Sequence, residues 1–233
     1  MTPILCLAGF GDDASMFDPL VDQAAGLNLH FHPLNLPGFG APPLRGQATT
    51  LNALAAWLAE QAEARGATTV LAHSVASIIA AIAANRTRSP LTTILSLEGN
   101  LTPEDAYFSG SAAQYDSAET FRPAFLSRLD EMAAQDPILA RYRQAVAKAD
   151  PQALWDLGCD ADRFSREHSP VALLQAVAHA AYLFNPDNLP DTSRAWLATH
   201  TLPRFELPGA SHWASVDQPR LLAETAAQAL AAA

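Results

Sequence analysis

Cysteine is scarce in this sequence of 233 residues, and its scarcity excludes two classes of protein. The two cysteines, Cys6 and Cys159, are too few for a disulfide framework and lack the spacing of metal ligands. Charged residues are also few, at 16%, whereas hydrophobic residues make up 49%. Disordered chains have the opposite balance, so we expect a folded protein with a sizeable core.

Long hydrophobic runs and an excess of basic residues are missing as well. No apolar run reaches the roughly 18 residues that a membrane-spanning helix requires, and the first residues lack the basic segment of a secretory signal. The net charge of −10 disfavours nucleic acids and anionic membranes as partners, because phosphate groups bind basic surfaces. We therefore expect a cytoplasmic protein.

The sequence does contain an alternation of short apolar runs with helical patterns. Strands are expected at residues 3–9, 29–36, 68–72, 92–97, 181–184 and 204–207. Helices are expected at residues 15–25, 50–64, 75–85, 170–180, 192–199 and 218–232. This order is typical of βαβ units and predicts an α/β fold with a mostly parallel sheet flanked by helices.

The alternation breaks between residues 100 and 169, where the pattern is mostly helical and polar. It resumes afterwards with the same strand and helix signals. One sheet domain with a helical insertion explains this better than two consecutive domains. We therefore expect a core formed by residues 1–99 and 170–233, with residues 100–169 inserted as a helical cap.

Ser74 stands at a sharp turn between an expected strand and an expected helix, in the segment VLAHSVA of residues 70–76. Small residues, Ala72 and Ala76, flank it at minus two and plus two. A nucleophile on a strained strand-to-helix turn requires small neighbours, because the backbones approach closely there. The N-terminus of the following helix also favours negative charge. A serine at such a place is otherwise a helix cap.

Four segments, taken in order, resemble the α/β-hydrolase family. They are LAGFGDDASMFDPL from residue 7, LPGFGAPP from residue 36, AHSVA around Ser74 and GASHWASVDQP from residue 209. The sequence departs from the family where alanines replace the elbow glycines and where Ala8 replaces the usual histidine. The resemblance implies an α/β-hydrolase fold with Ser74 as nucleophile and residues 100–169 in the place of a variable cap.

A serine nucleophile needs a base, and the resemblance assigns this role to His212. The residue lies in a loop between the last expected strand and the last expected helix. His73 abuts the nucleophile, but the family position implies that its side chain points away from the reacting centre. The resemblance also assigns the two backbone N–H donors of an oxyanion hole to Phe10 and Val75.

Two carboxylates compete for the role of the acid that orients His212. Glu98 ends an apolar strand 24 residues after Ser74, at the sheet edge that faces a ligand crevice. Asp187 follows the strand whose end most family members use. However, the usual pattern there is G-x-x-D, and the residue three after Asn185 is Asn188. Glu98 is the favoured choice, and Asp187 stays open.

The resemblance implies a serine hydrolase that cleaves a carboxylic ester or thioester of a small molecule through an acyl-enzyme, without a cofactor or metal. A C–C bond hydrolase or a lyase-type member of the same fold is the alternative enzyme, since a fold does not fix its chemistry. A non-catalytic ligand-binding homologue is the alternative outside catalysis. The substrate and the oligomeric state do not follow from the sequence.

Overall fold

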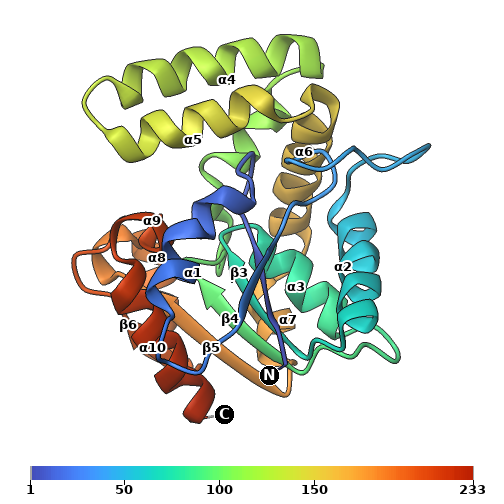
Figure 1. Cartoon of the computed structure of the whole chain (residues 1–233). Coiled ribbons are helices and arrows are strands. Elements are labelled where there is room, and N and C mark those ends of the chain that lie inside the picture. Colours follow the sequence, from blue (N-terminus) through green and yellow to red (C-terminus); the bar gives the residue numbers. More distant parts are fainter. Residues whose placement is uncertain (1, 233) are drawn as a thin grey trace.

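A computed structural model, which describes residues 2–232, shows one sheet of six parallel strands in the order β2-β1-β3-β4-β5-β6 (Figure 1). The strands are β1 (Ile4–Leu7), β2 (Phe31–Leu34), β3 (Thr69–His73), β4 (Thr93–Leu97), β5 (His179–Phe184) and β6 (Arg204–Glu206). The predicted parallel α/β sheet is thereby confirmed.

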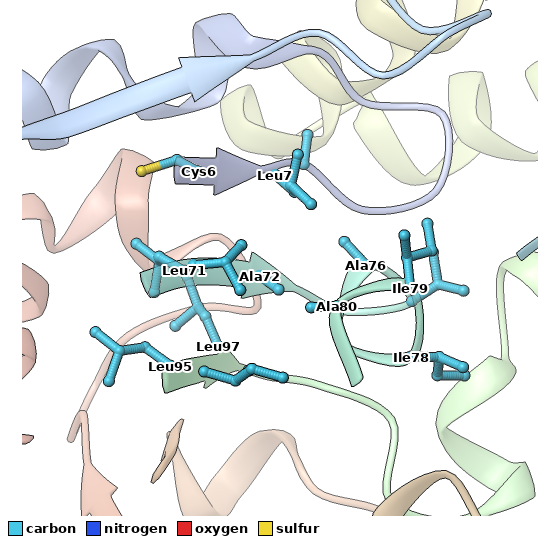
Figure 2. Packing of buried hydrophobic residues seen from close by; sticks show 14 of the residues in the cluster. Cys6, Leu7, Leu71, Ala72, Ala76, Ile78, Ile79, Ala80, Leu95 and Leu97 are labelled. Atoms are coloured by element: carbon cyan, nitrogen blue, oxygen red, sulfur yellow. The ribbon is translucent and has the colours of Figure 1, made fainter. Parts of the chain in front are cut away.

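The central strands are short and apolar because both of their faces are covered. Every residue of β1 is buried, as are the last four residues of β3 and of β4. Figure 2 shows side chains of these strands, such as Leu71 and Leu97, in one buried cluster that extends to Ile79 of helix α3 (Ala76–Ala84). Burial on both faces is what the near-continuous hydrophobic runs of parallel strands predict.

Helices cover both faces of the sheet (Figure 1). Those outside residues 100–169 are α1 (Asp18–Gln23), α2 (Leu51–Arg65), α3, α7 (Pro170–Gln175), α8 (Asp191–Thr199), α9 (Ala214–Asp217) and α10 (Pro219–Ala231). In Figure 1, α2, α3 and α7 lie on one face and α1 and α10 on the other. No helix within residues 2–232 combines the length and the hydrophobicity needed to cross a membrane.

The expected element types are correct, but several boundaries differ. The helix expected at residues 15–25 is divided into a 3-10 turn, η1 (Ala14–Phe17), and helix α1, which ends at Gln23. Helix α7 ends at Gln175, because His179 already pairs with Thr93 in the sheet. Helix α9 lies in a stretch expected to be loop. Sheet pairing and local turns determine these element boundaries, and the hydrophobic periodicity of the sequence does not predict them.

Residues 100–169 form two 3-10 turns and three helices. They are η2 (Pro103–Ala106), η3 (Ser109–Gln114), α4 (Ala118–Ala133), α5 (Pro137–Lys148) and α6 (Pro151–Glu167). Asp136 and Asp150 cap α5 and α6, and a proline follows each of them at the first helical position. Figure 1 shows α4 and α5 side by side, beyond one end of the sheet.

The strand order changes direction between β1 and β3, since the chain adds β2 on one side of β1 and β3 on the other. In open α/β sheets, ligands bind outside the carboxyl ends of the strands at such a switch point. Gly9 and Phe10 follow β1, and Ser74 follows β3. The topology therefore brings the segment after β1 and the segment around Ser74, two of the four that resemble the family, to one place.

Candidate active site

Ser74 lies on the turn between β3 and α3, in a left-handed backbone conformation with φ of 54°. This conformation costs a residue with a side chain roughly 1–2 kcal/mol. The N–H of Ser74 donates to the carbonyl of Leu97 at 2.9 Å, which ties the turn to the end of β4. Ala72 and Ala76 are fully buried beside it. The strained turn predicted from the small neighbours of Ser74 is therefore present.

Gly9 allows the loop after β1 to approach this turn. A Cβ atom at Gly9 would lie 2.9 Å from the Cβ of Ser74, closer than Cβ atoms approach other atoms, and would make a tight contact of 3.2 Å with the carbonyl oxygen of His73. The next residue, Phe10, is therefore held beside Ser74. Within residues 2–232, the N–H groups of Phe10 and Val75 donate to no backbone carbonyl, so both are free to bind a negatively charged oxygen.

His212 lies in the loop between β6 and α9 and lines the same cavity as Ser74. Its Nδ1 is 3.7 Å from Oε2 of Glu98. This distance exceeds that of a hydrogen bond, which is about 2.7–3.2 Å. Catalytic hydrogen bonds are often long without substrate and shorten in the reacting complex.

Glu98 is buried, with 6% of its surface exposed, and it has a left-handed backbone with φ of 47°. Its other carboxylate oxygen, Oε1, accepts hydrogen bonds from the N–H of Asn185 at 2.6 Å and from Nδ2 of Asn188 at 3.1 Å. Two donors therefore hold the carboxylate with one oxygen directed at His212.

Asp187 is exposed in the turn η4 (Pro186–Asn188), and the structure does not bring it to His212. Its N–H donates to Oδ1 of Asn185, as in ordinary turn chemistry. The segment that suggested Asp187 has another role, because its asparagines bind Glu98. Asn188 occupies the position of the usual acid, and its amide donates a hydrogen bond where an aspartate would accept one.

His73 does not point away from the candidate site, contrary to the expectation from the family position. Its ring lies 4.6 Å from the ring of His212, between centroids, and it lines the cavity. Its Nε2 is 2.9 Å from the carbonyl oxygen of His212 and therefore carries the proton, since a carbonyl only accepts. Burial, and then the neighbouring His212, lower the pKa of His73 well below its usual value. His73 is thus a neutral support of the His212 loop.

Asp12 joins three parts of the molecule at the cavity wall. Only 1% of it is exposed, and it forms an ion pair with Arg141 of α5. Its Oδ2 also accepts a hydrogen bond from Nε1 of Trp213 at 3.1 Å. Burial raises the pKa of Asp12, and the charge of Arg141 opposes this rise. The carboxylate of Asp12 therefore connects the loop after β1 with the loop that carries His212 and with α5.

The cavity has a volume of about 20 Å³. This is room for about one water molecule, which needs roughly 10–15 Å³. Its core walls are Gly9, Phe10, Asp12, His73, Ser74, His212 and Trp213, and the residues from 100–169 are Asp105, Tyr107, Phe108, Ser109 and Tyr142. A larger cavity of about 350 Å³ lies at the amino ends of β4 and β5 and contains none of these residues.

Sequence reasoning missed Asp12, Trp213, Tyr142 and the two asparagines as members of this site. Asp12 and Trp213 lie within two of the segments that resemble the family, so their positions were a usable signal. Asn188 was noted only as a departure from a pattern. Tyr142 lies in a helix with no motif, and nothing in the sequence singles it out.

Known proteins support the fold that these observations indicate. The model of the alpha/beta hydrolase family matches residues 4–225. An esterase from Thermogutta terrifontis is similar, with 18% identity, a TM-score of 0.75, and 100% of this chain and 90% of that chain covered. MenH from S. aureus shares 12% identity, with a TM-score of 0.76 and coverage of 99% and 94%.

A third structure, AqDC in a study of ring-cleavage of the Pseudomonas quinolone signal, shares 17% identity, with a TM-score of 0.74 and coverage of 100% and 92%. No curated protein matches the sequence. At these identities the structures show the fold alone, whereas the family model spans nearly all of the sheet, the Ser74 turn and the His212 loop. The chain therefore belongs to the alpha/beta hydrolase family.

Proposed function

We propose that this protein is a serine hydrolase that cleaves a carboxylic ester or a thioester through an acyl-enzyme. Membership of the family supports a hydrolase. The proposed serine mechanism rests on one observation, which is the convergence of Ser74, His212 and Glu98. Ser74 is presented on a strained turn, His212 lines the same cavity, and Glu98 faces Nδ1 of His212.

In the proposed reaction, Ser74 Oγ attacks the carbonyl carbon of the substrate while Nε2 of His212 takes its proton. Glu98 stabilises the imidazolium that forms. The N–H groups of Phe10 and Val75 bind the oxygen that becomes negative. His212 then protonates the leaving alcohol or thiol. Water, activated by His212, cleaves the acyl-enzyme and releases the acid.

Residues 100–169 act in this proposal as a cap over a core of residues 1–99 and 170–233. Their side chains form part of the wall of the 20 Å³ cavity. A substrate larger than water enters only when part of this wall moves. The proposed substrate is a small acyl compound in the cytoplasm.

A fluorophosphonate probe tests the proposal directly, because it reacts with activated serines. We expect it to label Ser74 and no other residue, as measured by mass spectrometry of the labelled peptide. Ser74→Ala is the matched control and should abolish both labelling and hydrolysis of a generic acyl ester. Failure of the wild-type protein to react, under conditions that label a known esterase, contradicts the proposal.

The same assay separates the alternatives. One structural neighbour comes from a study of ring-cleavage. Because one fold can host several chemistries, C–C bond cleavage is the alternative reaction. Labelling of Ser74 without turnover of esters or thioesters favours that alternative. No labelling together with ligand binding favours a non-catalytic homologue.

A further inference from the structure

The loop that carries one proposed oxyanion donor has little stiffness of its own. Phe10 lies between Gly9 and Gly11, and Gly11 has φ of 72°. Residues without a Cβ leave the adjoining peptide planes free to rotate. The loop's own turn is closed by a long hydrogen bond of 3.3 Å, from the N–H of Asp12 to the carbonyl of Gly9. Other contacts must therefore fix the orientation of Phe10.

Helix α5 supplies these contacts through two consecutive residues. The hydroxyl of Tyr142 donates to the carbonyl oxygen of Phe10 at 2.7 Å, and Tyr142 is 2% exposed. Arg141 forms the ion pair with Asp12, two residues further along the loop. Burial, and then the nearby Asp12, raise the pKa of Tyr142 well above its usual value, so its hydroxyl keeps its proton and remains a donor.

The side chain of Phe10 is also held from outside the core. Its ring lies 5.8 Å from that of Phe125 and 6.3 Å from that of Phe121, both of α4. Residues 100–169 thus fix both the backbone and the side chain of Phe10. The position of α4 and α5 therefore determines where the N–H of Phe10 points.

We propose that Tyr142 is a positioning residue of the oxyanion hole: its hydroxyl, supported by the Arg141–Asp12 ion pair, holds Phe10 so that its N–H faces the oxygen formed at Ser74. This inference rests on the proposed hydrolase function. According to this inference, the oxyanion hole is complete only while α5 packs against the loop after β1. A movement of α5 away from this loop therefore lowers the catalytic rate.

Tyr142→Phe tests the inference, because it removes one hydroxyl and keeps the ring. A lost oxyanion donor costs about 10²–10³-fold in kcat, and we expect a misplaced one to cost about 10–100-fold with KM nearly unchanged. The affinity for a trifluoromethyl ketone, which forms an oxyanion on Ser74, should fall by the same factor. A merely structural role would not lower kcat and analogue binding together.

Tyr115→Phe is the matched control, since Tyr115 is a half-buried tyrosine of the same region outside the cavity. It should keep wild-type kinetics. Arg141→Met provides a second variant should Tyr142→Phe not fold, and it should lower kcat in the same direction. Wild-type kcat and analogue affinity in both variants overturn the inference while the proposed function stands. A wild-type protein that neither reacts with the phosphonate nor hydrolyses esters overturns both.

Discussion

Glu98 uses its two carboxylate oxygens differently. Oε1 is held by Asn185 and Asn188, and Oε2 faces His212 at 3.7 Å. Asp187, the alternative acid, is exposed to solvent two residues after Asn185. An imidazole needs one fixed acceptor to hold its tautomer. A substitution that removes this acceptor at Glu98 should therefore impair the proposed catalysis.

We expect Glu98→Gln to lower kcat by about 10⁴-fold, as an amide does in place of the acid in such triads. Gln is nearly the same size, so the fold should be retained. Asp187→Asn is the matched control and should change kcat less than twofold. Steady-state kinetics with an acyl ester measure both. A large loss in Asp187→Asn with none in Glu98→Gln would assign the acid to Asp187 instead.

His73 makes stability depend on pH. In the unfolded chain its pKa is about 6.5, whereas burial keeps it well below that value in the folded protein. Below pH 6.5 the unfolded state therefore binds a proton that the folded state does not. The free energy of unfolding should fall with decreasing pH by up to about 1.4 kcal/mol per pH unit from this group.

Urea unfolding at pH 7.5, 6.5 and 5.5 measures this slope. His73→Gln should flatten it below pH 6.5, whatever its effect at pH 7.5. His168→Gln replaces an exposed histidine and should leave the slope as in the wild type. An unchanged slope in His73→Gln would show that other groups cause the acid sensitivity.

At the scale of elements, α6 supplies acceptors to N–H groups at the start of α2, whose own N-cap is Thr50. The carboxylate of Asp160 accepts from the N–H of Leu51 at 2.8 Å, and that of Asp156 accepts from the N–H of Thr49 at 3.0 Å. The first N–H groups of a helix have no partner within the helix, and they favour negative charge. Two carboxylates one turn apart on α6 thus attach this helix to the start of α2.

Asp160→Ala should therefore destabilise the protein by about 1–3 kcal/mol, because the buried N–H of Leu51 loses its acceptor. Alanine suits a helix, and the ion pair that Asp160 forms with the exposed Arg163 contributes little, so most of the loss comes from Leu51. Asp162→Ala, which removes an ion pair with the exposed Arg166 on the same helix, should cost less than about 0.5 kcal/mol. Chemical denaturation measures both, and equal effects would argue against the role of Asp160 as an acceptor for Leu51.

At the scale of the whole molecule, residues 100–169 and the loop after β1 share one aromatic cluster. The rings of Phe121 and Phe125 stack at 5.3 Å, and Phe10 of that loop packs against both. Phe125 also contacts Phe108. A shared cluster, together with the polar contacts of Asp12 and Asp160, predicts that the two parts unfold together.

Phe125→Ala should lower the free energy of unfolding by about 3–5 kcal/mol while thermal unfolding remains a single transition. Met132→Ala, on the same helix but 39% exposed, should cost less than about 0.5 kcal/mol. Calorimetry checks both. Two separate transitions in Phe125→Ala, with only the first shifted, would show that residues 100–169 unfold independently.

The sequence by itself determined the strands, most helices and the elbow around Ser74. These features are local: buried parallel strands are continuous apolar runs, and a strained turn requires small residues beside it. The position of His212 followed from the order of family segments along the chain. The choice between Glu98 and Asp187 did not, since both follow strands that end at one edge of the sheet.

Only the tertiary structure decided which side chains meet. Tyr142 and Phe10 are 132 residues apart, Arg141 and Asp12 are 129 apart, and Asn188 and Glu98 are 90 apart. Such contacts depend on how the inserted helices lie over the sheet, and no period or motif encodes them. His73 turned toward the cavity for the same reason, because its partner is a backbone carbonyl that exists in that place only after folding.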